Sequence, residues 1–259
     1  MLARERELQG ARFATVLAPH PHLPTYYARA DHRPAWVRDI FDRTAGDYDR
    51  LESIVGLGAG LWYRRRALRA AGLGPGMRVL DVGTGTGLLA RAAAELIGDP
   101  TRVTGVDPSP GMLEHARVPA GVRLLTGSAE SLPVASGSVD FLAMGYALRH
   151  SNDLAAALAE FHRVIRPGGR LCMLEFSLPA GRVSRALLKF WLLRVVPRIA
   201  SLVADPVDAP LLMRYHWDTI AACVPPATIL AAVREAGFSD IERHVELGLL
   251  SAYCARRPG

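Results

Sequence analysis

Between Arg78 and Phe176 the chain alternates short apolar runs with amphipathic stretches. The apolar runs predict five strands, at residues 78–82, 102–106, 122–125, 139–144 and 170–176. The stretches between them have helical spacing and predict helices over residues 88–97, 109–117 and about 152–165. Ser109 is the expected cap of the second helix, and Ser151 or Asn152 that of the third. Because strands that alternate with helices are joined by right-handed crossovers, we expect a mainly parallel sheet.

Further helical patterns flank this region, and the longest of them follows it. Residues 34–41 and 61–71 predict two helices before the first strand. Residues 182–222 predict a helical insertion, which is expected to form a lid. After a helix near Pro226, two last strands are predicted at residues 241–247 and 250–255. The expected fold is α/β and Rossmann-like: a mainly parallel seven-stranded sheet with an antiparallel C-terminal hairpin at its edge, helices on both faces and a helical lid.

The first 33 residues differ from the rest of the chain. They are polar and contain three histidines and three prolines. They form either a flexible arm or a segment packed on the domain. The domain itself is expected to span residues 34–259. No pair of these histidines has the spacing of metal ligands on a helix, and we expect no metal site.

Composition narrows the function further. Half of the 259 residues are hydrophobic and 22% are charged, which is typical of a globular protein. The net charge of +6 does not indicate a nucleic-acid partner, because no zinc-finger, RNP or basic-zipper spacing accompanies it. Cys172, Cys223 and Cys254 lie far apart and form no CxxC pair, so neither a zinc site nor a disulfide framework is expected.

The sequence suggests a cytoplasmic location. Its N-terminus alternates charges and lacks the apolar core of a signal peptide. The longest apolar stretch, Leu187 to Val203, is interrupted by Lys189, Arg194, Pro197 and Arg198 and should not span a bilayer. Two interpretations of this stretch stay open: a lid and core helix, or a basic-edged apolar surface that touches a membrane.

A glycine-rich loop, Asp81-Val82-Gly83-Thr84-Gly85-Thr86-Gly87, follows the first strand and precedes a helix. Such a loop lets a ligand approach the backbone closely and binds nucleotides at the carboxyl ends of parallel strands. Its glycines run GxGxG, because Leu88 takes the place of the third glycine in the GxGxxG pyrophosphate fingerprint. The carboxylate of Asp81 would repel a pyrophosphate and attract a cation.

S-adenosylmethionine suits these features, since it carries a sulfonium, an ammonium and a ribose but no phosphate. Asp107 closes the second strand 20 residues after Gly87, where a carboxylate can accept hydrogen bonds from two ribose hydroxyls. Ser128-Ala129 follows the third strand, where it either meets the adenine edge or forms a plain turn.

The loop and three later stretches together resemble the pattern of class I S-adenosylmethionine-dependent methyltransferases: VTGVDPS, LTGSAESLP and RVIRPGGRLCMLEFS. The last stretch is closely similar to the signature of the UbiE/MenG family, and FDRTAGDYD, YALRH and VPRIASLVA support the likeness. The resemblance covers about residues 34–255. It implies an enzyme that uses S-adenosylmethionine to C-methylate the ring of a prenylated quinol in ubiquinone or menaquinone synthesis.

The resemblance also implies site residues. It places Met112 against the adenine and Tyr48 near the methionine end of the cofactor, although either could be a core residue. It assigns the other cofactor contacts to Asp81, Gly83, Gly85, Thr86, Gly87, Asp107, Ser128, Ala129 and Gly145.

Several positions depart from the family. Its residues after Tyr-Asp are replaced by Leu51, Glu52, Gly56, Gly60 and Tyr63. Gly145 stands where the family has a cofactor-contacting serine, and His150 where it has asparagine. Apart from Gly145, the residues expected to bind the cofactor match the family pattern, whereas those expected to bind the substrate differ from it. A methyltransferase acting on another aromatic or natural-product small molecule, at C, O or N, therefore remains the alternative.

C-methylation of a phenol needs a group that removes the hydroxyl proton or one that stabilises the negative charge left on the oxygen. The loop after the fourth strand supplies a candidate for each role. Arg149 would stabilise the phenolate, since its guanidinium keeps its proton and cannot act as a base. His150 titrates near neutrality and could accept the proton. Glu175 is expected to hold Arg149 rather than to react, and Tyr215 and His216 are further pocket candidates.

The expected partner is thus a small, lipophilic aromatic or quinol substrate. A peripheral membrane contact and a homodimer stay open. A non-catalytic cofactor-binding scaffold is disfavoured because the loop glycines, Asp107 and Arg149 are all present. A nucleic-acid methyltransferase is disfavoured too, since no Pro-Cys and no Asp/Asn-Pro-Pro-aromatic motif follows the fourth strand.

Overall fold

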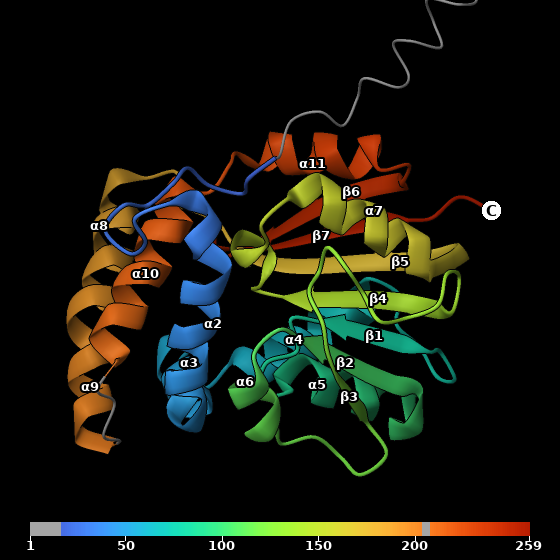
Figure 1. Cartoon of the computed structure of the whole chain (residues 1–259), viewed down its shortest axis with the longest axis horizontal. Coiled ribbons are helices and arrows are strands. Elements are labelled where there is room, and N and C mark those ends of the chain that lie inside the picture. The colour runs from blue at the N-terminus through green and yellow to red at the C-terminus, as the bar shows by residue number, and fades with distance from the viewer. Residues whose placement is uncertain (1–16, 204–207) are drawn as a thin grey trace, which may run out of the picture.

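The computed structural model describes residues 17–203 and 208–259, and its centre is a seven-stranded sheet (Figure 1). The strands are β1 (Val79–Val82), β2 (Val103–Asp107), β3 (Arg123–Thr126), β4 (Val139–Gly145), β5 (Ile165–Phe176), β6 (Ser239–Glu246) and β7 (Leu250–Arg256). Their order is β3-β2-β1-β4-β5-β7-β6. The first five run parallel, and β7 pairs antiparallel with both β5 and β6. The predicted parallel sheet with an antiparallel hairpin edge is confirmed.

Helices cover both faces of the sheet because successive side chains of its buried strands point to opposite sides. Val79 packs with α4 (Gly60–Ala70) and α5 (Leu88–Ile97) on one face. Leu80 and Val82 pack with α7 (Leu154–Val164) and α11 (Pro226–Glu235) on the other. All four residues of β1 are buried, as expected for a strand covered on both sides.

A separate layer of helices stands beside one end of the sheet, at the left of Figure 1. It consists of α2 (Arg33–Thr44), α3 (Tyr48–Val55), α8 (Arg182–Phe190), α9 (Val196–Val203) and α10 (Ala209–Ala222), with a π-helical turn at Trp191–Val195. The layer has its own apolar core, which includes Ile40, Leu51, Leu192 and Leu212. The expected helical insertion at residues 182–222 thus packs against the N-terminal helices, apart from residues 204–207, which lie outside the described chain.

Three details differ from the sequence-based expectation. Asp153, not Ser151 or Asn152, caps α7, because its carboxylate accepts from the N–H groups of the first turn while the Ser151 hydroxyl donates to Leu148 O at 2.7 Å. The strand β5 begins at Ile165, directly after α7, with a register shift where it pairs with β4. The helix after Ser109, α6 (Pro110–Glu114), ends one turn early.

Residues 17–33, which we call the N-terminal strap, lie against α7, α10 and the loop after β4. Leu17 O accepts from Leu154 N at 2.9 Å, and Pro19 O accepts from Val224 N at 2.8 Å. Tyr26 donates its hydroxyl to Asp218 at 2.6 Å and packs edge-on against Tyr215. Residues 1–16 of the predicted arm lie outside the described residues.

Within residues 17–203 and 208–259, no helix combines the length and apolar character needed to cross a membrane.

Candidate active site

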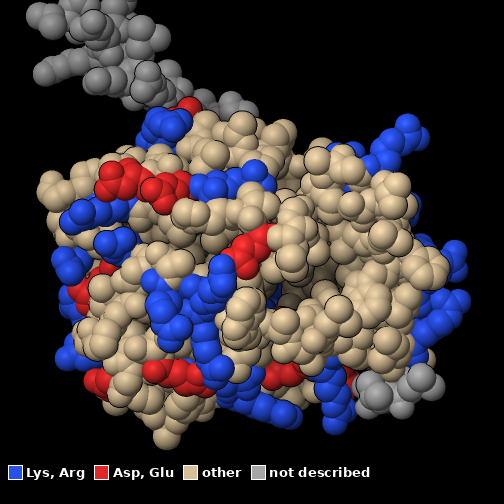
Figure 2. All heavy atoms as spheres, turned by 180° about the vertical axis from the view of Figure 1, so that it is seen from behind, with Lys and Arg blue, Asp and Glu red and all other residues tan. Residues whose placement is uncertain are grey.

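A cavity of about 620 Å³ opens at the carboxyl edge of the sheet, between the loops that follow β1 and β4. These neighbouring strands continue to β2 on one side and to β5 on the other, so the cavity lies at the topological switch point where α/β sheets bind ligands. Helices α2, α3 and α10 supply its outer wall. On the back of the molecule the surface is hollowed, and uncharged residues border most of the hollow (Figure 2).

The glycine-rich loop lies on the floor of this cavity, close to the loop after β4. The N–H groups of Gly83 and Thr84 both donate to Val106 O, at 2.8 and 3.1 Å, which folds the loop over the end of β2. Gly83 has φ 69°, and a Cβ there would lie 2.5 Å from the Cβ of Ala147. The contact between the two loops therefore requires glycine at this position.

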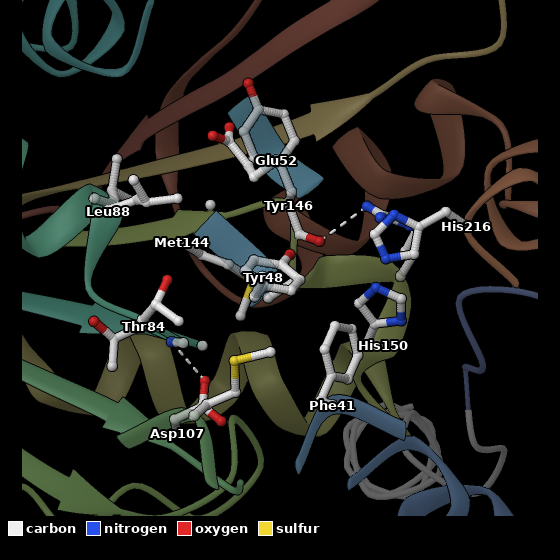
Figure 3. Close-up of a pocket in the computed structure, with 18 of the residues that line it drawn as sticks. Phe41, Tyr48, Glu52, Thr84, Leu88, Asp107, Met144, Tyr146, His150 and His216 are labelled. Carbon is white, nitrogen blue, oxygen red and sulfur yellow. Dashed lines mark hydrogen bonds between the residues drawn. The ribbon is translucent and has the colours of Figure 1, made fainter. Parts of the chain in front are cut away.

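Asp107 ends β2 with its carboxylate on the cavity wall. Its oxygens accept from Gly85 N at 2.8 Å and from Ser109 N at 2.9 Å, and Figure 3 shows the first of these bonds beside Thr84. Burial raises the pKa of Asp107 to about 6, although both backbone donors oppose the shift. Each carboxylate oxygen keeps a further lone pair, as two ribose hydroxyls would need.

Asp81 lies beneath the loop and does not line the cavity. Thr84 donates its hydroxyl to Oδ2 of Asp81 at 2.7 Å, whereas Oδ1 has no hydrogen-bond partner among the described residues. Burial raises the pKa of this carboxyl to about 7, and the neighbouring Asp107 adds to the shift. A cation bound above the loop would favour the ionised form of both groups.

Two further carboxylates, which sequence reasoning did not single out, support the same end of the cavity. Asp42 accepts from the Ser109 hydroxyl at 2.5 Å and from Gly111 N at 2.8 Å. Asp49 accepts from the Thr86 hydroxyl at 2.5 Å. The loop is therefore surrounded by acidic groups, which suits a ligand with a sulfonium and an ammonium and disfavours a pyrophosphate.

The other predicted cofactor residues divide into two groups. Gly87 does not line the cavity: it starts α5 with φ 87°, and its backbone faces the Val118 side chain. The remaining ones all line the cavity: Tyr48, Gly85, Thr86, Met112, Ser128, Ala129 and Gly145. Burial raises the pKa of Tyr48 to about 12, so this phenol stays neutral. The residues present therefore fit S-adenosylmethionine: the Asp107 carboxylate has the free lone pairs that two ribose hydroxyls would need, and acidic groups surround the loop.

Arg149 lines the opposite side of the cavity and is 1% exposed. Its Nη1 is ion-paired with Oε1 of Glu175 and donates to Tyr146 O at 2.9 Å, while its backbone N–H donates to Glu175 Oε2 at 3.2 Å. Nε lies 3.3 Å from Thr219 Oγ1, and Nη2 makes no hydrogen bond with the described residues. Glu175 thus holds Arg149, as the sequence analysis expects, and one face of the guanidinium stays available.

His150 follows Arg149 and packs among aromatic rings. Its Nδ1 lies 3.3 Å from the Tyr215 hydroxyl, and its ring contacts Phe41 edge-on. Burial, reinforced by the charge of Arg149, lowers the pKa of His150 well below 6.5. The expectation that His150 titrates near neutrality is therefore wrong, because the low pKa makes the resting ring neutral and a weaker base than a free imidazole.

A partly buried ion pair between Glu52 and Arg64 is a second feature that sequence reasoning missed. Arg64 Nη1 donates to Glu52 Oε1 at 2.6 Å, and the guanidinium lies 5.0 Å from the centroid of the Tyr146 ring. A Cβ at Gly60 would lie 2.5 Å from Glu52 Oε1, so the pair fills the space beside that glycine. The two departures from the family at Glu52 and Gly60 are thus one packing arrangement, which only the structure brings together.

No cluster of three or more His, Cys, Asp or Glu side chains suited to a metal occurs in the described part of the chain.

Comparison with known sequences identifies relatives of this chain. The sequence profile of the ubiE/COQ5 methyltransferase family matches residues 28–255. A demethylmenaquinone methyltransferase of Mycobacterium sp. (strain KMS) is 34% identical over 232 residues, which cover 89% of this chain and 98% of that protein. The ubiquinone/menaquinone biosynthesis C-methyltransferase UbiE of Coxiella burnetii (strain Dugway 5J108-111) is 30% identical over 221 residues, or 83% of this chain and 87% of that protein.

Solved structures confirm the predicted fold class. A SAM-dependent methyltransferase from Thermotoga maritima has a TM-score of 0.57 at 20% identity and covers 85% of this chain and 98% of its own. Phosphoethanolamine N-methyltransferase 2 of Haemonchus contortus, solved with S-adenosyl-L-methionine, has a TM-score of 0.55 at 18% identity and covers 76% of this chain and 52% of its own. The chain therefore belongs to the ubiE/COQ5 methyltransferase family and is a methyltransferase that uses S-adenosylmethionine.

Proposed function

We propose that this enzyme C-methylates the ring of a lipophilic quinol of the ubiquinone or menaquinone type. The names of its relatives suggest this substrate class. The observation that carries the proposal is the guanidinium of Arg149, fixed by Glu175 and buried in the wall of the cavity. A buried cation at this place stabilises the negative charge that a phenol must develop before its ring carbon can form a bond.

S-adenosylmethionine supplies an electrophilic methyl group on a sulfonium. The chain positions the acceptor for in-line transfer, and such positioning can contribute about 7–11 kcal/mol to lowering the barrier. Arg149 binds the acceptor's hydroxyl oxygen as it loses its proton, and this places electron density on the ring carbon that forms the new C–C bond. That carbon then loses its own hydrogen as a proton to water, which restores the aromatic ring.

His150 is our candidate for the group that accepts the hydroxyl proton. Its imidazole is neutral, because burial and Arg149 lower its pKa, and a neutral ring is the form able to take up a proton. A base with so low a pKa holds the proton briefly and passes it to water. Removal of His150 is therefore expected to slow turnover without abolishing it, since water can replace a weak base.

Two leucines at the mouth of the cavity support an acceptor with an apolar tail. Leu57 and Leu247 line the cavity but are 78% and 91% exposed. Both sit at turn tips with φ 51° and 55°, a conformation that leucine seldom adopts. Exposed apolar side chains beside a cavity are typical of a binding surface, and an apolar tail of the acceptor could cover these two leucines.

We further propose that α8 rests on an anionic membrane surface. Val183, Leu187 and Phe190 are 60–73% exposed and lie on one face of α8 at helical spacing. Arg182, Arg185 and Lys189 lie on the same helix, and no acidic residue occurs between Glu175 and Asp205.

Flotation with anionic liposomes at low salt should carry the protein to the top of the gradient, and Phe190→Ser should reduce the floated fraction. A protein that stays at the bottom contradicts this contact.

An activity screen with labelled S-adenosylmethionine tests the proposed function. The acceptors are benzoquinols and naphthoquinols that lack the ring methyl group, each with and without a prenyl tail. We expect transfer of label to the tailed quinols, and mass spectrometry of the product should place the new methyl group on a ring carbon. Preferential methylation of tail-free aromatics, or a methyl group on oxygen or nitrogen, would favour the alternative acceptor class instead.

A further inference from the structure

A second histidine, His216 on α10, faces the acceptor side of the cavity. Its side chain is 8% exposed and lines the cavity, and its Nε2 has no hydrogen-bond partner among the described residues. Figure 3 shows its ring beside that of His150. A buried ring nitrogen without a partner lowers stability, and a ligand in the cavity can satisfy it.

The ring of His216 packs against two neighbouring rings. Its ring centroid lies 6.0 Å from that of His150 and 6.2 Å from that of Phe41. Thr219 donates its hydroxyl to the carbonyl oxygens of Tyr215 and His216, at 2.8 and 3.1 Å, which holds this turn of α10 in place. The imidazole is therefore packed between Phe41 and His150 on a hydrogen-bonded turn of α10.

Arg149 and His216 differ in charge. The guanidinium is ionised and paired with Glu175. Burial, reinforced by the charge of Arg149, lowers the pKa of His216 well below 6.5, so its imidazole is neutral. A cation matches an oxygen that becomes negative during the reaction, whereas a neutral imidazole matches an oxygen that stays a hydroxyl.

We propose that Nε2 of His216 hydrogen-bonds to a second oxygen substituent of the acceptor ring and thereby selects rings with two oxygens over rings with one. This inference rests on the proposed function and refines its substrate class. His216 acts as a specificity-determining residue: Arg149 binds the oxygen beside the reacting carbon, and His216 binds the oxygen that takes no part in the bond change. Phe41 and Met213, which also line the cavity, offer that second oxygen no polar partner.

The test compares matched acceptors, one with two ring hydroxyls and one with the same ring and tail but a single hydroxyl. In His216→Phe, we expect KM for the two-hydroxyl ring to rise by about tenfold, which corresponds to the loss of one hydrogen bond of about 1.4 kcal/mol. KM for the one-hydroxyl ring should stay within twofold of the wild-type value. His216→Gln, whose amide can reach the place of Nε2, should restore the preference, and His162→Phe, outside the cavity against Phe238, is the matched control.

An equal change in KM for both rings, or no change for either, overturns the proposal. Binding without turnover separates this outcome from failure of the proposed function. Calorimetry with S-adenosylhomocysteine present measures the affinities of both rings in wild type and in His216→Phe. If no ring is methylated but the two-hydroxyl ring alone loses affinity, the contact stands and the assigned reaction does not. If methylation occurs but neither affinity nor KM distinguishes the rings, the reaction stands and the role of His216 does not.

Discussion

Arg33 donates a hydrogen bond from Nη2 to the carbonyl oxygen of Arg149, at 2.8 Å. Arg33 is 6% exposed, and it lies at the end of the N-terminal strap, 116 residues before its partner. The strap thus reaches the short helical turn Leu148–His150 that carries both proposed catalytic residues. Glu175 holds the side chain of Arg149 and Arg33 holds its backbone, so the guanidinium is oriented from two sides.

Arg33→Met tests whether the strap positions Arg149. Methionine keeps an unbranched stem but removes the donor, and the Arg149 carbonyl loses its partner. Because small misplacements of a catalytic group lower the rate, we expect kcat to fall by about tenfold while the Kd for S-adenosylmethionine stays unchanged. Arg29→Met, which removes an exposed ion pair with Asp31 from the same strap, is the control and should leave kcat unchanged. An unaltered kcat in Arg33→Met would show that the strap is only structural.

Arg149→Met should lower turnover by more than tenfold and preserve binding of S-adenosylmethionine, because Arg149 lies on the acceptor side of the cavity. It should also destabilise the protein by about 3–5 kcal/mol, since the carboxylate of Glu175 is left buried without its partner. Chemical denaturation and calorimetry measure the two effects separately.

The double variant Arg149→Met with Glu175→Gln distinguishes catalysis from stability. Replacing the unpaired carboxylate by a neutral amide removes most of the burial penalty, so the free energy of unfolding should return toward the wild-type value. Turnover should remain low in the double variant. Recovery of turnover together with stability would mean that Arg149 serves only to hold the loop.

The fold could be predicted from the chain because its signals are local. The buried strand before Asp81 and the glycines after it mark a strand–loop–helix unit, and Asp107 closes the next strand. Since carboxyl ends of parallel strands meet at one edge of the sheet, the sequence predicts that these residues and Arg149 lie together, without knowledge of the packing.

The remaining parts of the site depend on packing between distant segments. Arg33 reaches the carbonyl oxygen of Arg149 because the strap packs against the loop after β4, and no local pattern indicates this contact. The sequence offers His216 as a pocket candidate, but only the packing of α10 places it in the cavity wall. The Glu52–Arg64 pair needs the space beside Gly60, which appears only when α3 and α4 are packed. The low pKa of His150 is not evident from the sequence for the same reason, because the burial of the ring is a property of the assembled helical layer.

The affinity for S-adenosylmethionine should rise with pH between about pH 5.5 and 8. The pKa values of Asp107 and Asp81 are raised by burial to about 6 and about 7. A cationic ligand favours the ionised carboxylates, so binding releases protons while these groups are partly protonated, and affinity increases as they ionise. Without ligand, stability depends on pH with the opposite sign. The ordinary pKa of an aspartate is 3.8, so above that pH these two groups hold more protons in the folded protein than in the unfolded chain. Their contribution to the free energy of unfolding therefore falls as the pH rises through 6 to 7.

Calorimetry in two buffers of different ionisation enthalpy measures the released protons directly. We expect net release near pH 6.5 and almost none at pH 8.5, where both carboxylates are already ionised. Asp107→Asn should bind more weakly and release fewer protons. Proton uptake on binding, or an affinity independent of pH, would contradict the acidic environment assigned to the positive charges of the ligand.

Gly83→Ala should separate the two loops that form the cavity floor. The new Cβ would lie 2.5 Å from the Cβ of Ala147, and φ is 69°. Gly76→Ala is the matched control, because Gly76 has φ 74° but no atom within 4 Å of an added Cβ. Both variants should lose about 1–2 kcal/mol of stability from the left-handed conformation, and only Gly83→Ala should also weaken S-adenosylmethionine binding. Adding Ala147→Gly to Gly83→Ala should restore binding; failure to do so would place the defect elsewhere in the loop.

Replacing both Leu57 and Leu247 with serine should affect only acceptors with an apolar tail. Burying a leucine side chain is worth about 1.5–3 kcal/mol, so loss of two partly covered side chains should raise KM for a prenylated quinol by tenfold or more. The KM for the same ring without a tail should not change. Leu211→Ser, at a leucine that is 36% exposed and does not line the cavity, controls for a general loss of surface hydrophobicity. An equal rise in KM for both acceptors would mean that the two leucines shape the ring pocket instead of covering the tail.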